Sequence, residues 1–152
     1  ATLIQQYFSL ETADTGGVGG TLAANALSLA AMHATLDEVL TEAAFTTMTA
    51  LGARYEQGVN SVIEQHDIPW HSVRIGCRVE YLFVHERPRN GAQAAAAMDH
   101  ELDAFMHLYA LNRGILLTPF HLMALMSPTL TEADVDAHTT VFRSAVEELF
   151  GR

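Results

Sequence analysis

The sequence has 152 residues, of which 49% are apolar and 17% are charged, which is enough for one folded domain and too apolar for a disordered chain. Asp and Glu total 18 against 8 basic residues, and this net charge of −10 argues against nucleic acid and against an anionic membrane surface as partners. No apolar run is long enough for a transmembrane helix. The single cysteine, Cys77, allows no internal disulfide, so we expect a cytoplasmic location.

The first twenty residues are expected to form a connecting segment. Residues 1–10 are mildly amphipathic and predict a short helix, whereas residues 11–20 are polar and glycine-rich, which indicates a loop with unusual backbone freedom. The domain itself is expected over residues 21–152, beginning with a helix that Thr21 caps. Apolar residues recur in that helix at helical spacing, namely Leu22, Ala26, Leu29, Met32, Leu36 and Val39.

A second helix is predicted to start near Thr41 and to stop near His66, shortly before Pro69. Its apolar stripe comprises Phe45, Met48, Leu51, Tyr55, Val59 and Val62. Residues 71–84 then alternate with period two, which predicts a strand or a pair of strands with a bend at Gly76. The alternation assigns one face to Val73, Ile75, Cys77, Val79, Tyr81 and Phe83, and the other to Ser72, Arg74, Arg78 and Glu80.

The C-terminal half adds helices and two short strands. The alanines at 94–97 predict a helical turn, and Asp99 is expected to cap a helix that ends near Gly114. Residues 115–117 and 123–126 predict buried strands. Thr131 and Asp134 have the spacing of a capping box, and the last helix turns inward Val135, His138, Phe142, Val146 and Leu149. This order predicts helices packed on a short mixed or antiparallel sheet, an α/β (α+β) fold.

The glycine-rich loop that leads into Thr21 is the first candidate site. Backbone N–H groups at a helix start, together with a threonine hydroxyl, suit a phosphate group. The spacing does not match a dinucleotide-binding fingerprint, because Leu22 stands where the third glycine is required. A plain flexible loop is the alternative interpretation of these residues.

Thr118 and His121 lie between the two short C-terminal strands and are predicted to reach a pocket. A purely structural role is the alternative for His121.

The eight histidines do not form the i, i+4 pair of a zinc helix, and Cys77 is expected to be a buried, inert thiol, so no metal site is predicted. All eight basic residues are arginines, and this chain without lysine has neither a Walker-type phosphate loop nor a Schiff-base residue of its own.

Four segments together resemble a known family. Residues 19–31 read Gly-Gly-Thr-Leu-Ala-Ala-Asn-Ala-Leu-Ser-Leu-Ala-Ala, similar to the Gly-Thr-Leu-x-x-Asn-Pro-Leu-x-x-Ala-Ala segment of class III pyridoxal-phosphate aminotransferases, closest to the glutamate-1-semialdehyde aminomutase-like branch. The family order continues with a helix like Arg-Tyr-Glu-Gln-Gly at 54–58 and a strand with Arg-Ile-Gly-Cys at 74–77. It ends with Asn-Arg-Gly-Ile-Leu-Leu-Thr-Pro at 112–119 and Thr-Glu-Ala-Asp-Val-Asp at 131–136. The resemblance covers nearly the whole chain from Thr15 onward.

The resemblance implies that the chain is the C-terminal small domain of a fold-type I pyridoxal-phosphate enzyme. The family's chain is longer and carries its cofactor lysine upstream, on a large domain absent from this chain, so the resemblance places no catalytic residue here. In the family, the Gly-Thr pair contacts the cofactor phosphate of the other subunit of a homodimer, and Gly20 and Thr21 are expected to inherit that contact. The implied substrate is a small amino acid or amino aldehyde.

This sequence also departs from the family pattern. Asn25-Ala26 replaces Asn-Pro, residues 120–124 lack the glutamate usual in semialdehyde aminomutases, and Thr118 stands near where ω-aminotransferases often carry a carboxylate-binding arginine. Transaminase and aminomutase activity therefore both remain open. A non-catalytic binding or interaction module derived from the same domain is the alternative function. A reading frame that continues upstream into a lysine-bearing domain would favour the enzyme.

Overall fold

The computed structural model describes residues 25–118 and 122–151. The chain divides into two compact units, residues 1–40 and 41–152. The predicted helix at 1–10, the glycine-rich loop, Thr21 and His121 lie outside the described residues. None of the helices among the described residues is long and apolar enough to cross a membrane.

The described part of the first unit is helical. It consists of α2 (Ala26–Ala34) and a π-helical segment η1 (Thr35–Val39). The N-cap of α2 is Asn25, whose Oδ1 accepts a hydrogen bond from Ser28 N at 3.0 Å, so the prediction that Thr21 caps this helix is wrong. Asn is at least as good an N-cap as Thr, and here it lies at the right distance from Ser28. The predicted apolar stripe is exposed within the described residues of this unit, at Leu29, Met32, Leu36 and Val39.

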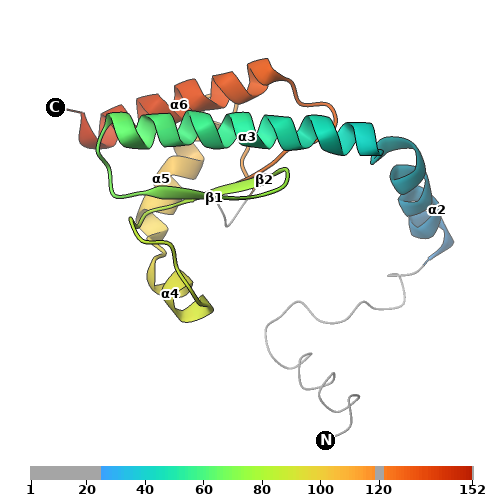
Figure 1. Cartoon of the computed structure of the whole chain (residues 1–152), viewed down its shortest axis with the longest axis horizontal. Coiled ribbons are helices and arrows are strands. Elements are labelled where there is room, and N and C mark those ends of the chain that lie inside the picture. The colour runs from blue at the N-terminus through green and yellow to red at the C-terminus, as the bar shows by residue number, and fades with distance from the viewer. Residues whose placement is uncertain (1–24, 119–121, 152) are drawn as a thin grey trace, which may run out of the picture. The chain divides into compact units, whose positions relative to one another are not determined.

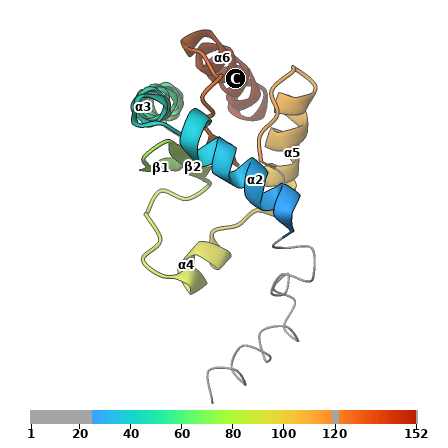
Figure 2. The ribbon, with the colours of Figure 1, turned by 90° about the vertical axis from the view of Figure 1, so that its right-hand side faces the viewer.

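The second unit places helices on one face of a small sheet. Its elements are α3 (Glu42–Gln65), β1 (His71–Ile75), β2 (Arg78–Leu82), α4 (Gly91–Ala96), α5 (His100–Leu111), β3 (Met123–Leu125) and α6 (Glu132–Phe150). Helices α3 and α6 lie side by side along their length (Figure 1), and α5 packs against α6. Figure 2 looks down the axis of α3 and shows the β1–β2 hairpin beneath this helix.

The helix limits follow local sequence signals. Thr41 caps α3 by accepting from Ala44 N, and α3 ends at the C-cap His66, as predicted. Asp99 caps α5 by accepting from Leu102 N. The capping box of Thr131 and Asp134 opens α6. In each case a short polar side chain pairs with a backbone N–H group that the helix leaves free, so the helix start needs no tertiary partner.

The sheet is a three-stranded antiparallel sheet in the order β1-β2-β3. Residues 71–84, predicted to be a strand or a pair of strands with a bend at Gly76, form a pair, β1 and β2, with Gly76 in the turn at a φ of +57°. Residues 123–125 form the predicted strand β3, whereas residues 115–117 are not a strand. The predicted strand at 115–117 is wrong because the main-chain bonds recorded for this stretch are Ile115 N to Ala110 O and Thr118 N to Met123 O, not a strand ladder.

The prediction that the apolar residues of β1 and β2 lie on the same face of the sheet is also wrong. The register pairs Val73 with Glu80 and Arg74 with Val79, and directly paired residues lie on the same face of a sheet. Because the turn has two residues, odd-numbered residues of β1 pair with even-numbered residues of β2. The apolar side chains predicted to share one face, all at odd-numbered positions, therefore point to opposite faces of the sheet in the two strands. Ile75 is consequently 75% exposed, while Val79 and Tyr81 are buried.

Polar side chains of β1 therefore face α3, and each one meets a partner there. The Ser72 hydroxyl donates to Asn60 Oδ1 at 2.8 Å. Arg74 Nε donates to Glu56 Oε2 at 2.7 Å. These two pairs join the hairpin to the middle of α3 and satisfy polar groups that would otherwise be costly to cover.

The core lies between α3, α6 and the sheet. The largest fully buried side chains are Tyr81, Val59, Val62, Val79 and Val146. The Tyr81 ring meets that of Phe142 edge-on, with centroids 4.9 Å apart, and the rings of Trp70 and Phe83 lie beside them. Phe45, predicted as part of the α3 stripe, is 47% exposed. It lies in the first turn of α3, at one end of the apolar stripe.

We expect Gly58→Ala to destabilise the protein by up to about 2 kcal/mol, because overpacking costs about 1–3 kcal/mol and the helix propensity of alanine returns about 1 kcal/mol. A Cβ at Gly58 would overlap Thr139 Oγ1 on α6 and would lie 3.0 Å from its Cγ2. Chemical denaturation measures the loss. In a Thr139→Ala background the same substitution should cost much less, and strictly additive effects would contradict this account of the α3–α6 contact.

Candidate functional site

Only one of the predicted site residues, Thr118, falls within the described residues. Gly20, Thr21 and His121 lie outside them, so the predicted phosphate contact stays a prediction. Thr118 is half-buried and lies on the wall of an open cavity of about 450 Å³. We call this the Thr118 cavity. Its volume falls in the range of small-molecule sites.

The Thr118 cavity is built by segments that are distant in sequence. The stretch that follows α5, residues 113–118, forms one wall, and residues 123–126 of β3 and its end form another. The start of α6 and Tyr55 of α3 contribute the rest of the lining. The apolar side chains that line it are Ile115, Leu116, Leu117, Met123, Ala124, Leu125, Met126, Leu130, Val135 and Ala137.

Two aromatic side chains from different helices pair at the cavity. Tyr55 of α3 and His138 of α6 both line it, and the Tyr55 hydroxyl lies 2.8 Å from His138 Nε2 in a hydrogen bond. Their ring centroids are 4.2 Å apart, and both residues are buried. Among the described residues, Nδ1 of His138 has no hydrogen-bond partner.

Burial keeps this pair uncharged. It lowers the pKa of His138 from 6.5 to about 3, because the imidazolium form loses its hydration there. It raises the pKa of Tyr55 well above the ordinary value of 10.0. Both groups are therefore neutral at pH 7. The sequence placed Tyr55 and His138 on inward stripes but did not indicate that they meet, since 83 positions separate them.

The two charged residues that line the cavity are exposed, and each is engaged locally. The guanidinium carbon of Arg113 lies 3.4 Å from the centroid of the Tyr109 ring, and Arg113 also donates to the Tyr109 carbonyl at 3.3 Å. Asp134 accepts from the Thr131 backbone and hydroxyl in the capping box. The Thr131 hydroxyl bond is the main reason that the pKa of Asp134 lies below its usual range.

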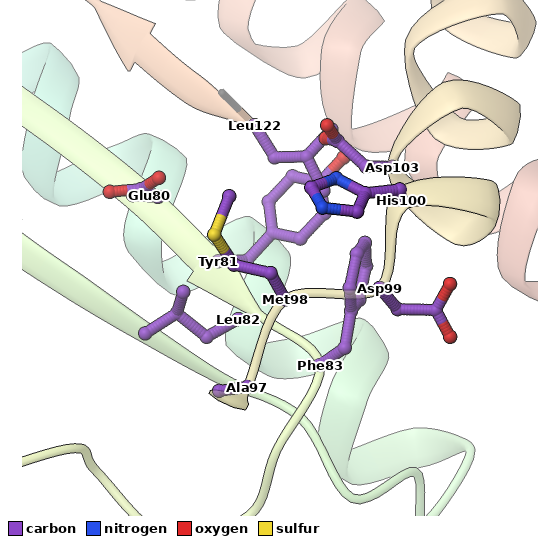
Figure 3. Close-up of a pocket in the computed structure, with 10 residues that line it drawn as sticks. All are labelled: Glu80, Tyr81, Leu82, Phe83, Ala97, Met98, Asp99, His100, Asp103 and Leu122. Carbon is purple, nitrogen blue, oxygen red and sulfur yellow. The ribbon is translucent and has the colours of Figure 1, made fainter. Parts of the chain in front are cut away.

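A second concave site lies between the end of β2 and the stretch that joins α4 to α5, and Figure 3 shows its side chains. It holds Glu80, Asp99, His100 and Asp103, but its volume is only about 50 Å³. Asp99 is already used as the cap of α5. Within residues 25–118 and 122–151, no group of three or more His, Cys, Asp and Glu side chains is placed to hold a metal ion. This site is too small for an amino acid substrate.

Comparison with known proteins finds glutamate-1-semialdehyde aminomutases among the relatives of this chain. No family model matches the chain. The chain is 33% identical over 131 residues to glutamate-1-semialdehyde 2,1-aminomutase 2 of Halalkalibacterium halodurans, a match that covers 86% of this chain and 30% of that protein. It is also 38% identical over 120 residues to glutamate-1-semialdehyde 2,1-aminomutase of Thermus thermophilus, covering 77% of this chain and 28% of that protein. The chain thus spans about 30% of the length of the curated relatives it matches.

Solved structures agree with these relatives. The crystal structure of a glutamate-1-semialdehyde aminomutase from Pseudomonas aeruginosa PAO1 matches with a TM-score of 0.82 and 51% identity, covering 90% of this chain and 30% of that one. Another crystal structure of a Pseudomonas aeruginosa PAO1 aminomutase of the same name is a complex with PMP. A β-phenylalanine aminotransferase from Variovorax paradoxus has the same fold, with a TM-score of 0.73 at 24% identity over 87% of this chain and 30% of that one.

Proposed function

The chain belongs to the class III pyridoxal-phosphate-dependent aminotransferases and corresponds to their C-terminal portion, and on this basis we propose that it acts as part of a longer aminotransferase or aminomutase. The observation that carries the proposal is the match to the Pseudomonas aeruginosa aminomutase, which is 51% identical and covers 90% of this chain. In this proposal residues 21–152 form the small domain, and residues 1–20 connect it to a lysine-bearing large domain.

The complete enzyme is proposed to use pyridoxal phosphate on a small amino substrate. When bound, this cofactor supplies an electron-accepting ring and a carbon that takes up the amino group. The lysine that holds it must come from outside this chain, which has none. Gly20 and Thr21 are the residues of this chain that we propose contact its phosphate.

One feature of the described residues supports a phosphate in that region. The helix α2 begins at Ala26, and its first turn carries no acidic side chain. No side chain of this turn therefore neutralises the positive end of the helix dipole, and such an end favours an anion. An acidic first turn, as in α5 or α6, would repel a dianion.

The partners proposed for the chain are the large domain and a second, identical subunit. Among the described residues of the first unit, several large apolar side chains are 45–81% exposed, namely Leu27, Leu29, Met32, Leu36 and Val39. Exposed apolar surface of this kind is typical of an interface. Because the chain has a single cysteine, which is free, we propose that the enzyme works in the reducing cytoplasm.

Thr21→Ala tests the phosphate contact in the full-length enzyme. The substitution removes one hydroxyl hydrogen bond to a charged acceptor, which is worth about 1.5–3 kcal/mol. Cofactor affinity should therefore fall by roughly 10- to 150-fold, at about 1.4 kcal/mol per decade. The rate of a single turnover at saturating cofactor should change little, because the phosphate is remote from the reacting carbon. Cofactor titration and single-turnover kinetics give the two values.

Mixed dimers decide which subunit Thr21 serves. If Thr21 acts across the dimer, pairing the Thr21→Ala subunit with a subunit that lacks the upstream lysine gives one site with both lesions and one site with neither. At a cofactor concentration too low to fill the Thr21→Ala homodimer, about half the normal activity per mixed dimer should then return. Confirmed subunit exchange without recovery would show that Thr21 serves its own subunit or no site at all.

A further inference from the structure

We infer that Asn90 is a site of spontaneous covalent modification, at which the side-chain amide is lost and aspartate or isoaspartate replaces asparagine. Asn90 is followed by Gly91, and this is the only Asn-Gly pair among the four asparagines of the sequence. The chemistry needs these two neighbouring residues and water, so the site takes no cofactor and no enzyme. The inference is independent of the proposed function.

The reaction is an attack within the main chain. The backbone nitrogen of Gly91 loses its proton to a base in solution and bonds to Cγ of Asn90, and the Cγ–Nδ2 bond then breaks to release ammonia. The product is a five-membered succinimide ring. Water opens this ring at either carbonyl, giving aspartate when it adds at Cγ and isoaspartate when it adds at the main-chain carbonyl carbon. No electron transfer takes place.

Gly91 makes the attack sterically easy. A glycine has no Cβ beside the attacking nitrogen, and its backbone reaches conformations that other residues avoid. Gly91 is exposed and is the first residue of α4, where a helix N–H group has no partner inside the helix. The residues that follow the other asparagines are Ala26, Ser61 and Arg113, and each carries a side chain that hinders the attack.

Local hydrogen bonds restrain Asn90 in the folded protein. Its Oδ1 accepts from Gln93 N at 2.9 Å, and its backbone is extended at a φ of −155° and a ψ of 168°. The Gln93 side chain in turn accepts from Arg89 N at 2.8 Å. Both bonds lie within residues 89–93, so they anchor the start of α4 only to itself. They break together when this stretch opens, and Asn90 Cγ is then free to meet the Gly91 nitrogen.

The helix α4 opens at low cost. It is six residues long, and none of them is buried. It lies away from α3 and α6 in both ribbon views (Figure 1, Figure 2). Short helices without a buried face have little stability of their own, and such segments open without unfolding the domain. Asn60, by contrast, lies in the interior of α3 and bonds the Ser72 hydroxyl, so it is released only when the second unit unfolds.

The two products differ in their effect on α4. Aspartate keeps an oxygen for the bond to Gln93 N and adds a negative charge beside Arg89. Isoaspartate adds a carbon to the main chain and moves the carboxylate out of the capping position. We therefore expect residues 91–96 to lose hydrogen-exchange protection in the isoaspartate product and to keep it in the aspartate product.

The test uses the full-length protein that contains this chain, incubated at mildly alkaline pH. Cleavage after glutamate releases residues 87–101 with Asn90 and residues 57–64 with Asn60. Mass spectrometry follows the replacement of NH2 by OH in each peptide, and methylation by an isoaspartate-specific methyltransferase detects the isomer. We expect the Asn90 peptide to convert at least about a hundredfold faster, because local opening of α4 is far more frequent than unfolding of the unit.

Three variants assign the cause. Gly91→Ala should slow the conversion by about tenfold or more, because it places a Cβ beside the attacking nitrogen. This Cβ would meet no atom within 4 Å, so the fold is kept. Ala94→Gly should speed the conversion about fivefold, the factor by which glycine lowers the helix population relative to alanine. Ala104→Gly is the matched control and should change nothing, since Ala104 is also an exposed helical alanine but lies on α5.

Four results would overturn the inference. In the full-length protein, Asn90 could keep its amide throughout, or the two peptides could convert at equal rates. A Gly91→Ala variant that reacts as fast as the unsubstituted protein would exclude the succinimide route. Equal rates in Ala94→Gly and Ala104→Gly would show that opening of α4 does not control the reaction.

Discussion

Lowering the pH from 6.5 to 4 is expected to remove about 3 kcal/mol of unfolding free energy through His138 alone. Burial lowers the pKa of this imidazole from 6.5 to about 3 in the folded protein. Below pH 6.5 the unfolded chain therefore binds a proton at His138 that the folded protein does not, and stability falls as the pH falls. The contribution is fully present above pH 6.5, and its loss is complete below about pH 3.

Denaturant titrations at several pH values measure this slope, which should approach about 1.4 kcal/mol per pH unit between the two pKa values. His138→Gln should remove this part of the slope while keeping a polar group near Tyr55. His33→Gln is the matched control, because His33 is exposed on α2. If the His138→Gln profile runs parallel to that of the unsubstituted protein, burial of the neutral imidazole is not what sets acid stability.

Phe142→Ala is expected to destabilise the protein by about 3–5 kcal/mol. Phe142 is only 2% exposed, and its ring lies against Tyr81 and near Trp70 and His138. Removing the ring deletes these contacts and leaves a cavity that Tyr81 and His138 cannot fill, because β2 and α6 hold their backbones in place. The free energy of unfolding from denaturant titration gives the loss.

Phe45→Ala is the matched control for Phe142→Ala. Phe45 belongs to an apolar stripe in the same way, but it is exposed on α3. Its removal should cost less than about 1 kcal/mol, since little packing is lost. Equal costs for the two substitutions would show that the aromatic cluster around Phe142 is not the centre of the core.

Local chemistry was readable from the sequence. The start of α3 at Thr41, the cap of α5 at Asp99 and the capping box of α6 each depend on residues within one helical turn. The alternation at 71–84 indicated strand structure for the same reason, because side chains of successive residues point to opposite faces, but it left open whether there was one strand or two. The family resemblance also needed only the order and spacing of motifs.

The way in which helices and strands pack on one another could not be predicted from the sequence in this way. The face shared by β1 and β2 depends on the number of residues in their turn, and one residue more or less inverts it. The stretch at 115–117 has strand-like residues but lacks a strand ladder. The exposure of Phe45 and Ile75 likewise depends on where neighbouring elements end.

The Thr118 cavity shows the same division most clearly. Thr118 was indicated by the sequence, but Tyr55 and His138 were indicated only as inward-facing residues of two separate helices. They meet because α3 and α6 pack side by side, and their neutrality follows from the burial that this packing creates. The spacing of residues along the chain thus determined most helices and the family of this protein. Tertiary packing decided which buried groups pair and whether they are charged, because only packing brings distant side chains together in a place that excludes water.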